Sequence, residues 1–187
     1  MNTSVPKNVP AAVPPAPSRL DEVVRRARTD AATRPEIHIT FDVEGGHRDE
    51  RYEFRFRASG SGEVETELRD NLRGLAKERT ISKLKSRELA DLLTVIDVPR
   101  LVRASRLQQR IPPGSVVGRL EVRAAGQVIT VVFMADPGQA RSAGYELPEG
   151  VAEIMERILE IGAKAMGLDD VRPWAVDERG GKQPWRG

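Results

Sequence analysis

Alternating apolar and polar residues in the middle of the chain predict short β-strands with one buried face. Residues 37–43 (IHITFDV) place an apolar side chain at every second position, which is the period of a half-buried strand. The same alternation recurs over residues 52–58 and 63–68, and a Ser-Gly-Ser-Gly turn joins these two segments. We therefore predict a strand followed by a hairpin, in an antiparallel sheet that keeps one face in water.

The charges of this hairpin also predict its register. If paired residue numbers sum to 120, Arg57 faces Glu63 and Phe56 faces Val64, so that opposite charges share one face and apolar residues share the other. A register shifted by one residue would mix the two faces. We expect the first register, with an odd-numbered loop of about three to five residues that contains a left-handed glycine.

A second hairpin is predicted over residues 116–134, and its two arms differ. Residues 116–122 alternate, whereas residues 128–134 (VITVVFM) are apolar on both sides, so we expect this arm to be a central strand or to be covered by a helix. Two amphipathic helices are predicted at residues 86–98 and 148–166, because their apolar residues recur at helical spacing.

This order of elements predicts the fold class. It is α+β, with a mostly antiparallel sheet of about five strands and the two helices packed on one of its faces. Residues 36–168 form a single core domain in this interpretation, preceded by a short amphipathic helix at residues 18–33. Residues 1–17 are a proline-rich flexible tail, and residues 169–187 are a polar tail; we expect both to be disordered or extended.

The two ends nevertheless carry candidate partner-binding residues. Leu20, Val23 and Val24 form the apolar stripe of the first predicted helix, which could dock on the core or on a partner. Both tryptophans of the chain, Trp174 and Trp185, follow the last predicted helix, and tryptophan is a common anchor at protein interfaces. Trp174 could instead fold back to cover the core of its own domain.

The composition limits which kinds of catalytic, metal or cofactor site the chain can contain. The chain of 187 residues contains no cysteine and only two histidines, His38 and His47, neither of which has a second suitable group at ligand or catalytic spacing. We therefore predict no catalytic residue, no metal site and no cofactor. No apolar stretch approaches the ~18 residues that a membrane span needs, and no secretory signal is recognisable, so we expect a cytoplasmic protein without membrane insertion.

Positive charge is concentrated in one part of an otherwise balanced chain. Lysines and arginines number 30 against 28 acidic residues, but residues 69–110 hold a clear excess of cations. Candidate anion-binding residues within this segment are Lys77, Arg79, Lys83 and Lys85. Such a segment can bind a polyanion, although it lacks the aromatic side chains that stack on bases. The alternative interpretation is a solvated basic surface.

The order of these segments resembles a known family. The stretch from Tyr52 through Gly60 to Leu68, followed by SRELADLL, GRLEVRAAGQVITVVF and LPEGVAEIMERIL, is similar to the β-β-α-β-β-α pattern of emfourin-like proteins. The namesake activity of that family is inhibition of thermolysin-like metalloproteases. The resemblance implies a small, non-enzymatic binding domain. The basic insertion and the terminal segments depart from a minimal domain of this kind, so no functional residue is carried over.

We expect a non-enzymatic protein–protein interaction module, acting as an accessory subunit, adaptor or inhibitor within a larger complex and using its terminal segments to dock. The alternative is a nucleic-acid-binding protein that uses the basic segment 69–110. The pattern makes no prediction about oligomeric state.

Overall fold

A single antiparallel sheet forms the centre of the fold in the computed structural model, which describes residues 18–46, 51–107 and 109–174. Within these residues the sheet has six strands in the order β4-β3-β2-β1-β5-β6. The strands are β1 (His38–Gly45), β2 (Tyr52–Ser59), β3 (Glu63–Asp70), β4 (Leu75–Lys83), β5 (Val117–Ala124) and β6 (Gln127–Met134). Each pair of neighbours is antiparallel.

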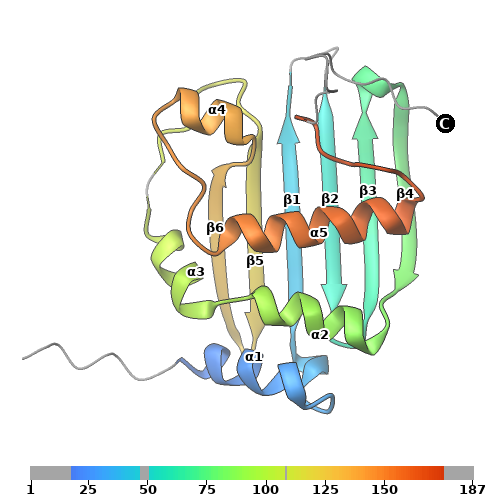
Figure 1. The fold of residues 1–187 in the computed structure, drawn as a ribbon, viewed down its shortest axis with the longest axis vertical. Coiled ribbons are helices and arrows are strands. Elements are labelled where there is room, and N and C mark those ends of the chain that lie inside the picture. The colour runs from blue at the N-terminus through green and yellow to red at the C-terminus, as the bar shows by residue number, and fades with distance from the viewer. Residues whose placement is uncertain (1–17, 47–50, 108, 175–187) are drawn as a thin grey trace, which may run out of the picture.

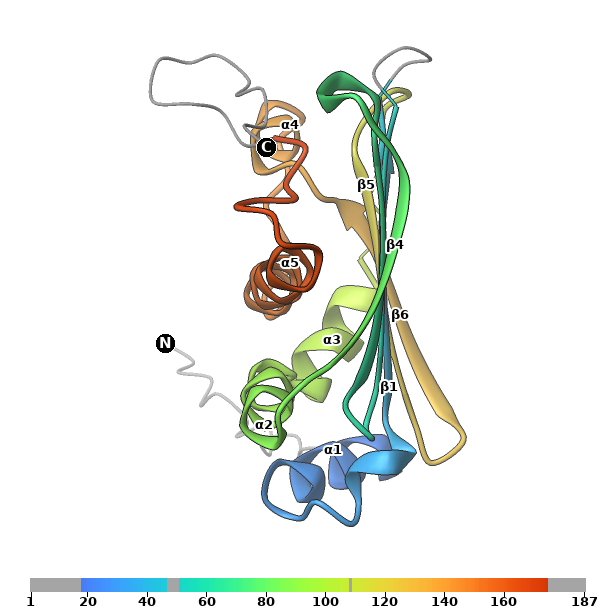
Figure 2. The same ribbon diagram turned by 90° about the vertical axis from the view of Figure 1, so that its right-hand side faces the viewer.

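All the described α-helices lie on one face of this sheet, and the opposite face carries none (Figures 1 and 2). They are α1 (Arg19–Thr29), α2 (Ser86–Val95), α3 (Val98–Ser105), α4 (Pro137–Ser142) and α5 (Val151–Met166), with two short 3₁₀ turns, η1 (Arg34–Glu36) and η2 (Asn71–Arg73). Ordinary end signals set their bounds: the Asp97 side chain accepts the Arg100 N–H at the start of α3, and Gly167 ends α5 at φ 67°.

The core lies between the sheet and these helices. The apolar members of the alternating strands point toward the helices, and Phe41, Phe54, Phe56 and Phe133 are fully buried there. Helix α5 approaches the sheet closely at Gly162, because a Cβ at that position would stand 2.6 Å from the ring of Phe54. The prediction of an α+β fold with an antiparallel sheet and one solvated face is therefore confirmed.

The predicted number of strands is wrong. The sheet contains six strands rather than about five, and α1, α3 and α4 join α2 and α5 on the covered face. The missed strand is β4, which lies in the segment that shows no regular pattern. None of its nine residues is buried, so the strand has no apolar alternation to reveal it. Of the two alternatives predicted for β6, a central position or cover by a helix, the structure shows the second, because β6 is an edge strand that packs against α3.

The register of the β2–β3 hairpin is also different from the predicted one. Paired numbers sum to 122, so Arg57 faces Glu65 and Ala58 faces Val64. A shift of two residues keeps charged and apolar residues on their own faces, which explains why patterning alone could not detect it. Gly60 attaches this turn to the segment before β1, because its N–H donates to the Ile37 carbonyl at 2.7 Å and its missing side chain leaves room for the Arg34 backbone.

No helix in the described ranges is long and apolar enough to cross a membrane. The tail predicted at residues 1–17 lies outside the described residues, as does residue 175 onward in the second predicted tail.

Candidate functional site

The uncovered face of the sheet presents rows of alternating charge. Side chains that alternate with the buried ones point to this face, and cations stand beside carboxylates across neighbouring strands. Ion pairs on it include Arg55–Glu67 at 3.7 Å, Arg57–Glu65 at 3.7 Å, Lys77–Glu67 at 3.1 Å, Arg79–Glu65 at 2.8 Å, Arg119–Glu121 at 3.9 Å, Arg123–Glu121 at 2.9 Å, and Arg51–Glu53. We call this surface the open face.

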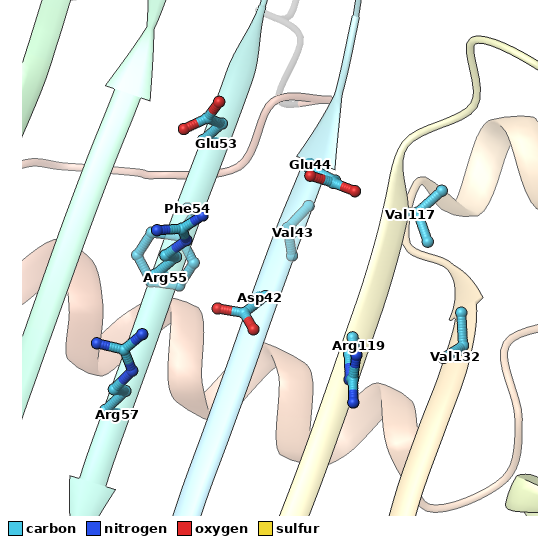
Figure 3. A pocket seen from close by; sticks show the side chains of 10 residues that line it. All are labelled: Asp42, Val43, Glu44, Glu53, Phe54, Arg55, Arg57, Val117, Arg119 and Val132. Carbon is cyan, nitrogen blue, oxygen red and sulfur yellow. The ribbon is translucent and has the colours of Figure 1, made fainter.

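A shallow hollow of about 490 Å³ lies near the middle of the open face, on β2, β1, β5 and β6 (Figure 3). It forms because the short side chain of Asp42 stands between two long ones, Arg55 on β2 and Arg119 on β5, which are its direct register partners. Val117 and Val132 line one side of the hollow, and Glu44 and Glu53 line its upper end in Figure 3.

Asp42 is the polar group at the base of this hollow. Burial raises the pKa of its carboxyl above the usual range, and the positive charges of Arg55, Arg57 and Arg119 offset this only in part. Its Oδ1 atom is buried and makes no hydrogen bond to any described residue. A buried carboxylate oxygen without a hydrogen bond costs free energy, and a donor that reaches it removes this cost. The hollow is therefore suited to a hydrogen-bond donor from outside the sheet.

The carboxylates of β3 connect β2 to β4. Glu67 accepts a hydrogen bond from Lys77, and this bond is the main cause that lowers the pKa of the glutamate. Glu65 lies between Arg57 and Arg79 in the same way. The cations of β4 are therefore neutralised in part by the neighbouring strand.

The four predicted anion-binding residues do not form one basic patch. Lys77 and Arg79 are exposed on the open face but paired with glutamates, and Lys83 lies in register with Glu63. Lys85 sits apart, immediately before α2. Farther along the basic segment, Arg100 and Arg103 contact Glu149 on the helical side.

The predicted partner-binding residues of the first helix face the core of their own domain. Leu20 and Val24 have exposed fractions of 1% and 0%, and Val23 is partly buried against the same core. Helix α1 is held there by Arg28, whose Nη2 donates to the Ile96 carbonyl at 2.7 Å. Leu20 and Val24 are consequently not accessible to a partner while α1 stays docked.

Trp174 is partly buried and packs against the core, and Trp185 lies outside the described residues. The segment before Trp174 is fastened to the end of the sheet by contacts that sequence reasoning missed. The buried Tyr52 hydroxyl donates to the Val171 carbonyl, and Arg73 Nη2 donates to the Arg172 carbonyl at 2.7 Å. Burial raises the pKa of Tyr52 well above its usual value.

Comparison with known proteins adds no family to this picture, because the chain matches no protein-family model and no curated protein sequence.

Proposed function

We propose that this protein is a non-enzymatic protein-binding module, an accessory subunit, adaptor or inhibitor, that docks through the open face of its sheet. The observation that carries the proposal is the one-sided arrangement of the fold. The helices cover one face of the sheet and leave the other uncovered across all six described strands. This face offers a broad surface of interleaved charges around the hollow at Asp42.

The charge pattern favours a protein over a polyanion. A nucleic acid requires cations whose charge is available to successive phosphates. On the open face Arg57, Arg79 and Arg123 instead each contact a glutamate of the same sheet. A partner protein, which itself carries both signs of charge, can complement such a surface with donors and acceptors of its own.

The hollow at Asp42 supports the same proposal. A lysine, arginine or backbone N–H of a partner that enters it would donate to the Asp42 carboxylate, while partner carboxylates would approach the arginines at its rim. Because the burial of Leu20 and Val24 removes them from the surface, we place the docking surface on the open face rather than on the first helix.

The test uses the full chain, purified with a light tag from its native host and examined by native mass spectrometry. We expect a stoichiometric complex with another protein. The variant Arg55→Gln/Arg119→Gln removes the two cations beside Asp42 and should release the partner. The matched control Arg157→Gln/Lys164→Gln removes two paired cations from α5, on the helical side, and should retain it.

Two results would overturn the proposal. Retention of the partner by both variants would exclude the open face as the docking surface. A chain that elutes without any protein partner, but with nucleic acid that only high salt removes, would exclude a protein-binding role and favour the basic segment.

A further inference from the structure

Strand β4 forms an edge of the sheet whose backbone is available to another strand. The Leu84 N–H donates to the Gly62 carbonyl at 2.8 Å, so Leu84 faces β3. Backbone groups alternate along an antiparallel strand, and those of Arg79, Ile81 and Lys83 therefore face away from β3. No described residue hydrogen-bonds to the outward N–H and C=O groups of these three.

The side chains of the same three residues stand on the open face. Arg79 pairs in register with Glu67 and Ile81 with Glu65, both of which point to that face. Ile81 is 64% exposed, the largest value among the exposed large apolar residues of the described chain. Figure 2 views the molecule from this side, with β4 in front of the rest of the sheet. The edge thus presents an apolar residue between two cations.

This pattern disfavours a second copy of β4 as the neighbour. Two copies paired antiparallel about Ile81 would place Arg79 directly opposite Lys83, and like charges in that position are destabilising. Strand β3 pairs opposite charges instead, because it places Glu63 opposite Lys83 and Glu67 opposite Arg79. Lys83, which has no ion pair within the described chain, and Arg79, which is also paired with Glu65 at 2.8 Å, can each meet a carboxylate on the side away from β3.

We propose that the β4 edge binds an extended acidic segment of a partner protein by strand addition. Carboxylates of that segment lie beside Arg79 and Lys83, with an apolar residue beside Ile81, and its backbone completes the hydrogen bonds of the edge. The inference rests on the proposed protein-binding function and names one chemical class of partner for it. Main-chain bonds supply affinity, and the alternating charges supply selectivity.

The probe is a fluorescein-labelled peptide, Thr-Glu-Thr-Val-Thr-Glu-Thr. Paired antiparallel with β4, it places its valine opposite Ile81 and its two glutamates opposite Arg79 and Lys83. Binding to the full chain is measured by fluorescence anisotropy at about 50 mM salt, where surface charges are weakly screened. We expect saturable binding. Replacing both glutamates with lysine, or methylating the valine nitrogen that faces Ile81, should each weaken binding by about tenfold or more.

Variants of the chain locate the site. Ile81→Pro removes an outward N–H without removing a bond to β3, and proline is tolerated in edge strands in that position. Arg79→Gln/Lys83→Gln keeps the backbone and removes the two cations. Each should weaken binding about tenfold or more, whereas Arg100→Gln/Arg103→Gln, which removes two paired cations from α3 on the helical side, should not. Circular dichroism and thermal melting show whether each variant is folded.

Several outcomes overturn the inference. These are absence of binding to the wild-type chain, equal binding of the N-methylated and parent peptides, or loss of binding in the α3 control. If Ile81→Pro does not fold, the N-methylated peptide still decides whether the backbone edge is used. If the peptide does not bind but the native complex is intact, strand addition at β4 is rejected and the proposed function is still supported.

Discussion

The two edge strands of the sheet are built in opposite ways. Strand β6 contains no charged residue, and three of its residues, Val131, Phe133 and Met134, are buried. Strand β4 has four charged residues and none that is buried. The sheet is thus fastened on the β6 side mainly by apolar packing and on the β4 side by backbone bonds and cross-strand ion pairs.

The two edges also differ in how they are covered. Helix α3 packs against β6, and the Gln109 side chain accepts the Met134 N–H at 3.1 Å, so part of the apolar edge is shielded (Figure 1). Strand β4 relies on charge instead. An uncovered edge of apolar residues would pair with other chains without selectivity, whereas charges on an edge restrict its partners. The edges differ in charge more than in exposure, because Val128 and Val132 of β6 are still 52% and 46% exposed.

The largest expected effect concerns packing beneath β6. Phe133→Ala removes a fully buried ring that stacks on Phe41 at 6.3 Å between centroids, and should lower the free energy of unfolding by about 3–5 kcal/mol. Thr80→Ala, on the covered side of β4, should cost no more than about 1 kcal/mol. Urea denaturation followed by circular dichroism compares the two. Equal losses of unfolding free energy in the two variants would contradict this prediction, because they would mean that β4 contributes to the core as much as β6.

The second prediction concerns the backbone of β4. Thr80→Pro removes a hydrogen bond to β3 and leaves a carbonyl of that strand unpaired, which should cost about 1–3 kcal/mol of unfolding free energy. Ile81→Pro, one position away, should cost clearly less because its N–H faces outward. The same denaturation experiment measures both variants. A larger loss for Ile81→Pro would show that the assigned direction of the edge is reversed.

The third prediction concerns the ion pairs that join β3 to β4. Glu67→Gln should lower the unfolding free energy by about 0.2–1 kcal/mol at neutral pH and low salt, the usual range for exposed pairs. The pKa of Glu67 is lowered in the folded state, so its contribution is present above the unfolded value of 4.5 and is lost as pH falls through the folded pKa.

The control for this change is Glu63→Gln, because Glu63 has no ion pair within the described chain. Thermal melts at low and high salt, and at neutral and acidic pH, should show a difference between the two variants only at neutral pH and low salt. Phe133→Ala should lose the same stability at both salt concentrations. A salt-independent effect of Glu67→Gln would argue against charge as the force that holds β4.

The smallest expected effect lies between the two edges, at Asp42. Its pKa is raised by burial, so ionisation penalises the folded state progressively as pH rises from the unfolded pKa to the folded one. Asp42→Asn removes this penalty and should stabilise the protein above the folded pKa, by no more than about 0.5 kcal/mol. Melting temperatures at neutral pH and at pH of about 3 test it. Destabilisation at neutral pH would indicate that the carboxylate is paired.

Helices α1, α2 and α5 and the strongly alternating strands were predictable because each carries its own apolar period, whereas α3 and α4 were not predicted. The leucines of α2 recur at helical spacing, and Phe54 and Phe56 alternate with arginines on β2. Strand β4 has no such period, since no packing demand acts on its side chains. The double-sided apolar pattern of β6 was correctly linked to cover by a helix but does not by itself distinguish a central strand from a shielded edge.

The candidate site was less accessible to prediction. Lys77 and Arg79 were recognised as cations, but their glutamate partners depend on a strand that the sequence pattern did not reveal. The hollow at Asp42 requires the alignment of β2, β1 and β5, and β5 lies more than 70 residues farther along the chain than β1. Prediction of such a site needs the register of strands that are distant in sequence.

In the strongly alternating strands and the predicted amphipathic helices, the sequence by itself determined which side chains share a face, because a period of two or of 3.6 residues is a local property of the backbone. It also determined that charged residues on β2 and β3 would share one face. The tertiary structure alone decided the strand order, the two-residue shift of the hairpin, and the contrast between an apolar edge at β6 and a charged edge at β4. These features depend on contacts between distant segments, whose relative positions are chosen by packing of the whole core rather than by local pattern.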